Sequence, residues 1–150
     1  MRVYTRNMDD RCICTALRQV AAQSTAHYDT VLAPSGLKVT LFRLLRRIEA
    51  ASSVTITELA EIVGLDRSTL GRNLRVLEKQ SLIAIRTGDD GRARRVSLTR
   101  IGQEKLQEAV PLWREAQREY SQIMGADTLA LLDHVIEQTA TSKHTTGDDA

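Results

Sequence analysis

Aromatic residues are scarce in this chain. Only 3% of its 150 residues are Phe, Trp or Tyr, although 42% are hydrophobic. The core must therefore be built mainly from Leu, Ile, Val and Ala. Leu and Ala suit helices, whereas the aromatic residues that favour strands are almost absent. The composition therefore predicts a mainly helical protein, and the length favours a single domain over residues 1–150.

The chain also lacks a long apolar run. No segment approaches the roughly 20 apolar residues that cross a bilayer. The first eleven residues are polar. They do not resemble a secretory signal peptide, which carries an apolar stretch before a small-residue cleavage site. These two absences predict a cytoplasmic protein that makes no contact with a membrane.

Cysteine and histidine are rare as well. The two cysteines, Cys12 and Cys14, can neither form a disulfide framework nor fill a four-ligand zinc site alone. The histidines His27, His134 and His144 are scattered, with no Cys, Asp or Glu at metal spacing around them. No Gly-rich phosphate loop is present. Because hydrolysis needs a nucleophile beside a base and metal chemistry needs a ligand cluster, we expect no metal, no cofactor and no enzymatic activity.

The charges that are present are unevenly distributed. Between residues 67 and 100 nine cations face three acids, whereas after residue 100 four cations face nine acids. The formal net charge of +2 therefore hides a segment of +6 followed by one of −5. A basic segment of this kind suits a phosphate-binding face on an otherwise neutral scaffold. Chance clustering of solvated charges gives the same counts, so charge alone leaves both interpretations open.

Two helices are predicted before the basic segment. In residues 10–32, apolar and small side chains recur at steps of three and four, the spacing of one helix face. The stripe consists of Cys14, Leu17, Ala21, Thr25, Tyr28 and Leu32. Pro34 and Gly36 break this pattern. A second helix is predicted over residues 40–50. Its apolar residues are Leu41, Leu44, Leu45 and Ile48.

A helix-turn-helix pattern follows. The predicted spans are 54–56 for a very short strand, 58–63 for one helix and 67–80 for the next. Thr57 and Asp66 are the expected N-caps of the two helices. Gly64 suits the left-handed residue that ends a helix. Two short helices joined by a tight turn that contains Gly define this motif.

The second helix of this pair has two distinct faces. The residues predicted to face the core are Leu70, Leu74 and Leu77. The opposite face carries Ser68, Thr69, Arg72, Arg75, Val76 and Lys79, with Asn73 at its border. It combines three cations with small hydroxyls and holds no acid. Such a face suits the major groove of DNA, where Arg reads guanine edges and hydroxyls or Lys reach phosphates.

A β-hairpin is predicted after the helix pair. Residues 82–87 and 94–99 are the expected strands, and the loop 88–91 holds turn residues. A hairpin in this position is the wing of a winged helix-turn-helix. Arg92 stands near its tip, from which an arginine can enter the narrow minor groove. The residues predicted to contact DNA are Ser68, Thr69, Arg72, Asn73, Arg75, Lys79, Arg92 and Arg94.

Two more helices are predicted at the C-terminal end. Thr99 is expected to cap a long helix over residues 100–124, which Pro111 should kink. A last helix is predicted over residues 128–139. Its inward residues are expected to be Leu129, Leu132, Val135 and Ile136.

The flanking helices require a role outside the winged unit. That unit occupies about residues 38–99, which leaves segments of about 10–33 and 100–141. The economical interpretation is that these segments pair with their copies in a second subunit and bury their apolar stripes. A homodimer also supplies two recognition helices for a pseudo-palindromic operator.

With this order of elements the chain resembles the MarR (multiple-antibiotic-resistance regulator) family over nearly its whole length. The matching pieces are Thr57-Glu58-Leu59-Ala60, Asp66-Arg67-Ser68-Thr69-Leu70, Leu77-Glu78, Ser81-Leu82-Ile83, Asp90-Gly91-Arg92, Val96-Ser97-Leu98-Thr99 and Gly102. The resemblance implies a triangular homodimer with recognition helices in adjacent major grooves and Arg92 in the minor groove. It also implies repression of transcription that a small ligand or oxidation relieves.

One part of the chain is similar to the peroxide-sensing members of that family. Cys14-Thr15-Ala16-Leu17, followed by Tyr28, implies a first-helix cysteine held by a tyrosine of the partner subunit. About 21 Å of straight helix separate Cys14 from Tyr28, so they cannot meet within one chain. Val39 stands where those sensors carry a second tyrosine, and no cysteine lies near the C-terminus. The alternative is that Cys14 is a small apolar residue buried in the dimer seam.

Two further questions stay open at the level of sequence. A winged helix that binds protein instead of nucleic acid is the alternative function, although such a surface should be aromatic or apolar rather than basic. An effector pocket between the dimer helices and the winged unit is implied by the resemblance. Trp113 or His27 would line it, unless both only pack in the core.

Overall fold

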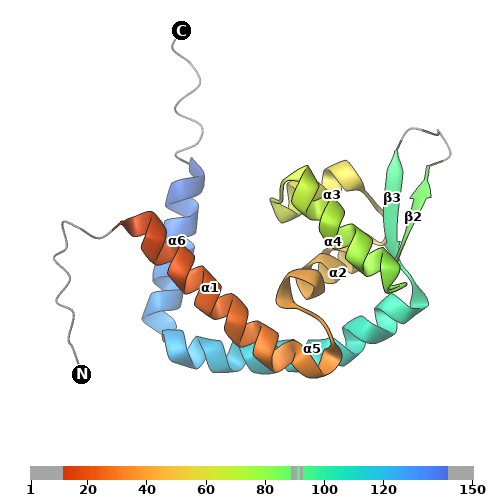
Figure 1. Ribbon diagram of the computed structural model, residues 1–150. Coiled ribbons are helices and arrows are strands. Elements are labelled where there is room, and N and C mark those ends of the chain that lie inside the picture. The colour runs from red at the N-terminus through yellow and green to blue at the C-terminus, as the bar shows by residue number, and fades with distance from the viewer. Residues whose placement is uncertain (1–11, 89–90, 92, 142–150) are drawn as a thin grey trace, which may run out of the picture.

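The computed structural model describes residues 12–88, 91 and 93–141. It is mainly helical, with one small sheet. In Figure 1, α1 (Ile13–Leu32) and α6 (Ala126–Thr141) lie on one side of the molecule, and the winged unit lies on the other. The long helix α5 (Arg100–Met124) joins the two sides. The predicted fold class, a winged helix-turn-helix flanked by terminal helices, is confirmed.

The winged unit contains most of the core. Its elements are α2 (Val39–Ala51), β1 (Val54–Thr55), α3 (Ile56–Val63), α4 (Arg67–Lys79), β2 (Ile83–Thr87) and β3 (Arg94–Leu98), preceded by the short 3-10 helix η2 (Ala33–Ser35). Leu45, Ile48, Leu59 and Val96 are all inaccessible to solvent. At about 25 cal/mol per Å² of buried apolar surface, this cluster is the main source of stability for the unit.

The sheet is antiparallel, with the strand order β1-β3-β2. Val96 of β3 is central to it, since it pairs with Val54 on one side and with Ile85 on the other. The hairpin was predicted with spans one residue too long at its outer ends. The pairing of β1 with β3, which joins segments 42 residues apart in sequence, was not predicted.

Capping residues fix the ends of α3 more tightly than was predicted. Thr55, not Thr57, is the N-cap: its Oγ1 accepts a hydrogen bond from the Glu58 amide at 3.1 Å, while the Glu58 carboxylate accepts one from the Thr55 amide at 2.9 Å. This reciprocal capping box draws Ile56 into the helix and leaves only Val54 and Thr55 as strand. Gly64 ends α3 in the left-handed conformation with φ 65°, as predicted.

The junction between the wing and α5 is tightly packed. Thr99 caps α5, as predicted, by accepting a hydrogen bond from the Gly102 amide, and its hydroxyl also donates to the Ser81 carbonyl at 2.6 Å. A Cβ placed on Gly102 would lie 1.9 Å from the Leu82 carbonyl oxygen. Only glycine therefore lets the first turn of α5 approach the start of β2 this closely.

Several predicted boundaries in the flanking helices need correction. α1 begins at Ile13 with Cys12 as an extended N-cap, so Cys12 lies outside the helix that was predicted from residue 10. α6 extends further at both ends than residues 128–139. α5 runs through Pro111 without interruption, and Figure 1 shows that it changes direction along its length. Among the described residues, every helix falls short of the length or the apolarity that a membrane crossing requires.

The predicted apolar stripes of the flanking helices are largely uncovered in the single chain. In α1 only Leu32 is fully buried, while Leu17 is 50% exposed. Ile136 was predicted to face inward and is instead 63% exposed, because one helix, α5, covers only one side of α6. Exposed apolar stripes on α1 and α6 are what we expect of helices whose apolar faces pack against a second subunit.

Candidate nucleic-acid interface

The candidate interface is the outward face of α4. Its inward face is anchored by Leu70, Leu74 and Leu77, none of which is more than 2% exposed, as predicted. The three leucines fix how the helix is rotated about its own axis, so the side chains on the opposite side must point to solvent. In Figure 1, α4 lies beside the hairpin of β2 and β3, which places the wing next to this face.

The cations of this face are accessible and unpaired. Arg72, Arg75 and Lys79 are exposed, and none of them forms an ion pair within the described part of the chain. Arg94, at the outer end of β3, is exposed in the same way. By contrast, Arg100 and Arg118 of α5 pair with glutamates one turn away. Unpaired guanidinium and ammonium groups keep all their donors for an external anion.

The hydroxyls of this helix are arranged differently from the cations. The Asp66 carboxylate caps α4 and accepts three hydrogen bonds, from the Thr69 amide at 2.9 Å, the Ser68 hydroxyl at 2.7 Å and the Thr69 hydroxyl at 2.6 Å. These bonds, the one from the Thr69 hydroxyl foremost, hold the pKa of Asp66 well below its usual range. The hydroxyl hydrogens of Ser68 and Thr69 are therefore already engaged in hydrogen bonds to Asp66, and each hydroxyl would have to turn away from Asp66 to donate to a phosphate.

The remaining two candidates for DNA contact are Asn73 and Arg92. Asn73 is half-buried, and its Nδ2 atom is enclosed without a hydrogen-bond partner in the described structure. It therefore lies at the border of the outward face, where the sequence placed it. Arg92, the predicted tip residue of the wing, lies outside the described residues.

The wing is held to the rest of the unit by Arg95, a residue that was not predicted to have this role. Its Nε donates to the Ser53 hydroxyl at 3.0 Å, and its Nη2 donates to the Ser53 carbonyl at 2.9 Å. These bonds tie β3 to the turn before β1. Arg95 and Ser53 are 42 residues apart in the sequence, so the local pattern of residue types could not predict these bonds.

The cysteine and tyrosine singled out as a redox pair lie apart within the chain, as the length of α1 requires. Cys14 is exposed near the start of α1. Tyr28 is half-buried near its end and donates a hydrogen bond to Gln117 of α5. Burial, and then the neighbouring Tyr120, raise the pKa of Tyr28. The Tyr28 hydroxyl thus already has a partner in its own chain, which the sequence did not reveal.

Several hollows adjoin α2 in the described part of the chain. The largest, of about 320 Å³, lies between α1, α2 and α5, and another, of about 300 Å³, lies beside Phe42, Arg46 and Trp113. The largest is lined by Ser24, Thr25, Tyr28, Val39, Thr40, Arg43, Trp113 and Gln117. Trp113 also stacks on Phe42, with ring centroids 5.7 Å apart, so it packs against the core and lines the cleft at once. His27 does not line it; its Nε2 lies 3.2 Å from the Glu119 carboxylate.

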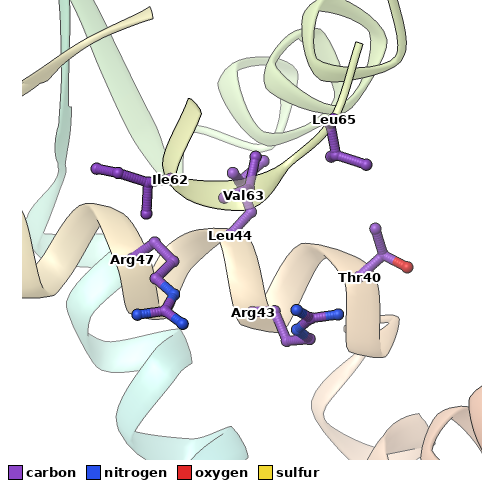
Figure 2. Close-up of a pocket in the computed structure, with 7 residues that line it drawn as sticks. All are labelled: Thr40, Arg43, Leu44, Arg47, Ile62, Val63 and Leu65. Atoms are coloured by element: carbon purple, nitrogen blue, oxygen red, sulfur yellow. The ribbon is translucent and has the colours of Figure 1, made fainter. Parts of the chain in front are cut away.

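A much smaller hollow lies between α2 and the turn that joins α3 to α4. Figure 2 shows Ile62, Val63 and Leu65 on one side of it and Arg43 and Arg47 of α2 on the other. At about 60 Å³ it is far below the roughly 300 Å³ of a usual ligand pocket. The cleft between α1, α2 and α5 is therefore the better candidate for a small-molecule site.

Together, the capped helix pair, the three-stranded wing and the long flanking helices define a winged helix-turn-helix protein with terminal helices outside the winged unit. A family model described as the MarR family matches residues 35–93. The chain is 36% identical to the M. tuberculosis transcriptional regulator MosR, solved in complex with DNA, with 89% of this chain and 99% of that chain covered and a TM-score of 0.77. The chain therefore belongs to the MarR family of transcriptional regulators.

Two other comparisons agree with this assignment. The chain is 27% identical to an uncharacterized HTH-type transcriptional regulator of Bacillus subtilis, YwaE, over 97% of this chain and 86% of the relative. A mutant MarR of E. coli, solved with operator DNA, is 20% identical and has the same fold, with a TM-score of 0.77 over 85% of this chain and 92% of that chain.

Proposed function

We propose that two copies of this chain form a cytoplasmic homodimer that binds a pseudo-palindromic operator in double-stranded DNA and represses transcription. The observation that carries this proposal is the outward face of α4, where Arg72, Arg75 and Lys79 are exposed and form no ion pair with any described residue. An acid-free cationic helix face anchored by buried leucines suits the major groove. A protein-binding winged helix would instead present an apolar or aromatic face.

The uncovered stripes of α1 and α6 support the homodimer. Among the described residues nine large hydrophobic side chains are substantially exposed, and six of them lie on α1, at the end of α5 or on α6. These six are Ile13, Leu17, Val20, Ile123, Leu131 and Ile136, which we call the seam residues. Pairing of the seam residues across a twofold axis would remove them from water and set two α4 helices apart on one duplex.

Arg72 gives the sharpest test of DNA reading. Arg72→Ala should cost about 1–3 kcal/mol of binding free energy and relax the preference at one base position, because a side chain that reads a base edge is lost. Lys79→Ala is the matched control, since loss of a phosphate contact should weaken binding about equally for all sequences. Affinities for an operator selected from random duplexes, and for its single-base variants, measure both effects. An equal loss on every variant with Arg72→Ala would reduce Arg72 to a phosphate contact.

Release by a small ligand is supported by the cleft between α1, α2 and α5. It lies where the flanking helices meet the winged unit, so a ligand there would alter how far apart two α4 helices stand. Arg43 gives the cleft a cation, and Trp113 gives it an aromatic wall. Because Trp113 is the chain's single tryptophan, its fluorescence reports whether the cleft is occupied.

Release by oxidation is supported by the two thiols at the start of α1, both of which are exposed. Hydrogen bonds from Thr15, first from its side chain and then from its backbone amide, lower the pKa of the Cys12 thiol and so favour the reactive thiolate. Cys14, with Tyr28, is the pair that the resemblance to the peroxide-sensing members of the family implies. The thiolate would attack peroxide, the O–O bond would break, and sulfenate and water would form.

Single substitutions separate the two thiols. Hydrogen peroxide should lower the affinity of the wild-type protein for its operator by at least about tenfold if the seam shifts, which corresponds to about 1.4 kcal/mol. With Cys14 as sensor, Cys14→Ser should keep full affinity in peroxide while Cys12→Ser should still respond. The reverse pattern assigns the role to Cys12. A response that persists in the double variant would exclude oxidation of either thiol as the trigger.

The family consists of transcriptional regulators, and we propose that this chain has no catalytic activity of its own. The described residues hold no cluster of three or more metal-binding side chains. The histidines of the described part, His27 and His134, lie on different helices, α1 and α6. The grouped polar side chains on α4 are cations and capping hydroxyls, which suit anion binding rather than proton transfer.

A further inference from the structure

Val76 is an exposed apolar residue on the recognition face of α4. It is 42% exposed, whereas the inward leucines of the same helix are nearly inaccessible. Within the described ranges it is one of three strongly exposed large hydrophobic residues that lie outside the seam residues, the others being Ile62 and Ile101. Contact between subunits through the seam therefore does not account for it. A β-branched side chain in water also adds nothing to helix stability.

The position of Val76 relative to Arg72 is fixed by helix geometry. Four residues advance the helix by about 6 Å and turn it by about 40° beyond a full circle. Ser68, Arg72 and Val76 therefore form one stripe along the outward face, with Val76 one turn beyond Arg72. Since base pairs are stacked about 3.4 Å apart, Val76 lies opposite a base one or two pairs from the one that faces Arg72.

The charges around Val76 indicate which surface it fits. Arg72, Arg75 and Lys79 lie within four residues of it along the helix, and all three are exposed. An apolar spot enclosed by cations is poorly suited to an apolar protein groove, because the cations would lose their hydration there. In the major groove the same cations face phosphates and guanine edges, and the one apolar group on a base edge is the thymine methyl.

We propose that Val76 packs against a thymine methyl group in each operator half-site, one or two base pairs from the position read by Arg72. This inference rests on the proposed function and adds a specificity-determining residue to it. The side chain is short, so it reaches a base edge only where the helix lies deep in the groove. Ser68 and Thr69, one turn before Arg72 on the same helix, are small and are drawn back to Asp66 by their hydrogen bonds, so they permit that approach.

The test replaces thymine by deoxyuridine, which keeps base pairing and removes only the methyl group. In an operator selected from random duplexes, one thymine per half-site, one or two base pairs from the base sensitive to Arg72→Ala, should show the effect. Replacing it should weaken binding by about three- to fivefold, since one methyl leaves an apolar contact. Val76→Ala should weaken binding to the thymine operator by a similar factor and abolish the difference between thymine and deoxyuridine.

Two controls make the result decisive. Ile62→Ala removes a similarly exposed apolar side chain, 50% exposed on α3, and should leave the discrimination of the methyl intact. Val76→Thr keeps the shape of the side chain and should lower the discrimination without loss of folding, which the melting temperature checks. Equal affinity for both bases with the wild-type protein, or discrimination that survives Val76→Ala, overturns the proposal. Absence of any sequence-selective binding overturns the proposed function itself and is distinguishable from both.

Discussion

Gly102→Ala is expected to destabilise the protein by overpacking the junction between the wing and α5. The new Cβ would lie 1.9 Å from the Leu82 carbonyl oxygen, which is backbone and cannot rotate away. The same carbonyl accepts the Thr99 amide at 3.1 Å, so α5 and the start of β2 would have to separate. We expect a loss of about 3 kcal/mol from overpacking, offset by about 1 kcal/mol of better helix propensity.

Gly71→Ala is the matched control for this prediction. Gly71 lies within α4, and a Cβ placed on it meets no atom within 4 Å. The same substitution should therefore stabilise the protein by up to about 1 kcal/mol, through helix propensity alone. Urea unfolding at one fixed protein concentration measures both variants, because a dimer gains apparent stability with concentration. Equal midpoints for Gly102→Ala and the wild type would contradict the close approach of α5 to Leu82.

Placing acids in the seam should separate the subunits. In the double variant Leu17→Glu with Ile136→Glu, each chain would have to bury two unpaired carboxylates at several kcal/mol apiece. The dissociation constant of the dimer should rise by at least about a thousandfold. The folded chain should survive, since these side chains are 50% and 63% exposed in it. Operator affinity should fall with dimer formation, because only a dimer presents two linked α4 helices.

Ile101→Glu serves as the control for the seam. Ile101 is 53% exposed and belongs to the first turn of α5. In Figure 1 that end of α5 adjoins the wing, and α6 follows the opposite end. The substitution should leave the dimer unchanged. Sedimentation velocity gives the mass of each variant, and circular dichroism confirms its helical content. A double variant that stays dimeric would place the subunit interface somewhere other than the seam residues.

The helices of the winged unit could be predicted because their signals are local. Leu70, Leu74 and Leu77 recur at helical spacing. Gly64 ends α3 and Asp66 caps the start of α4, and each lies next to the helix end that it determines. The one misplaced cap had its signal in the sequence. Thr55 is followed by a glutamate three residues later, as a capping box requires, whereas the residue three positions after Thr57 is Ala60.

The parts that were missed depend on contacts between distant segments. The pairing of Val54 with Val96, the bonds from Arg95 to Ser53 and the approach of Gly102 to Leu82 leave no periodic trace in the sequence. Helical spacing identifies an apolar face but does not say what covers it. That is why Ile136 was expected to be buried and is exposed in the single chain.

The sequence predicted which residues form the outward face of α4, but it did not predict the hydrogen bonds among them. The cations of α4 point outward because the leucines point inward, and both follow from spacing alone. The hydrogen bonds that hold Ser68 and Thr69 to Asp66 depend on side-chain rotamers at the helix start, which spacing does not define. The role of Arg92 stays a prediction, as does that of Arg94.

The affinity of the wild-type protein for duplex DNA as a function of salt tests the central claim most directly. Two cationic faces that neutralise about six to ten phosphates should lose about 10³–10⁵ in affinity between 50 and 200 mM salt, with two chains bound per operator. No binding to any duplex in dilute buffer, or an affinity that does not change with salt, would contradict the account.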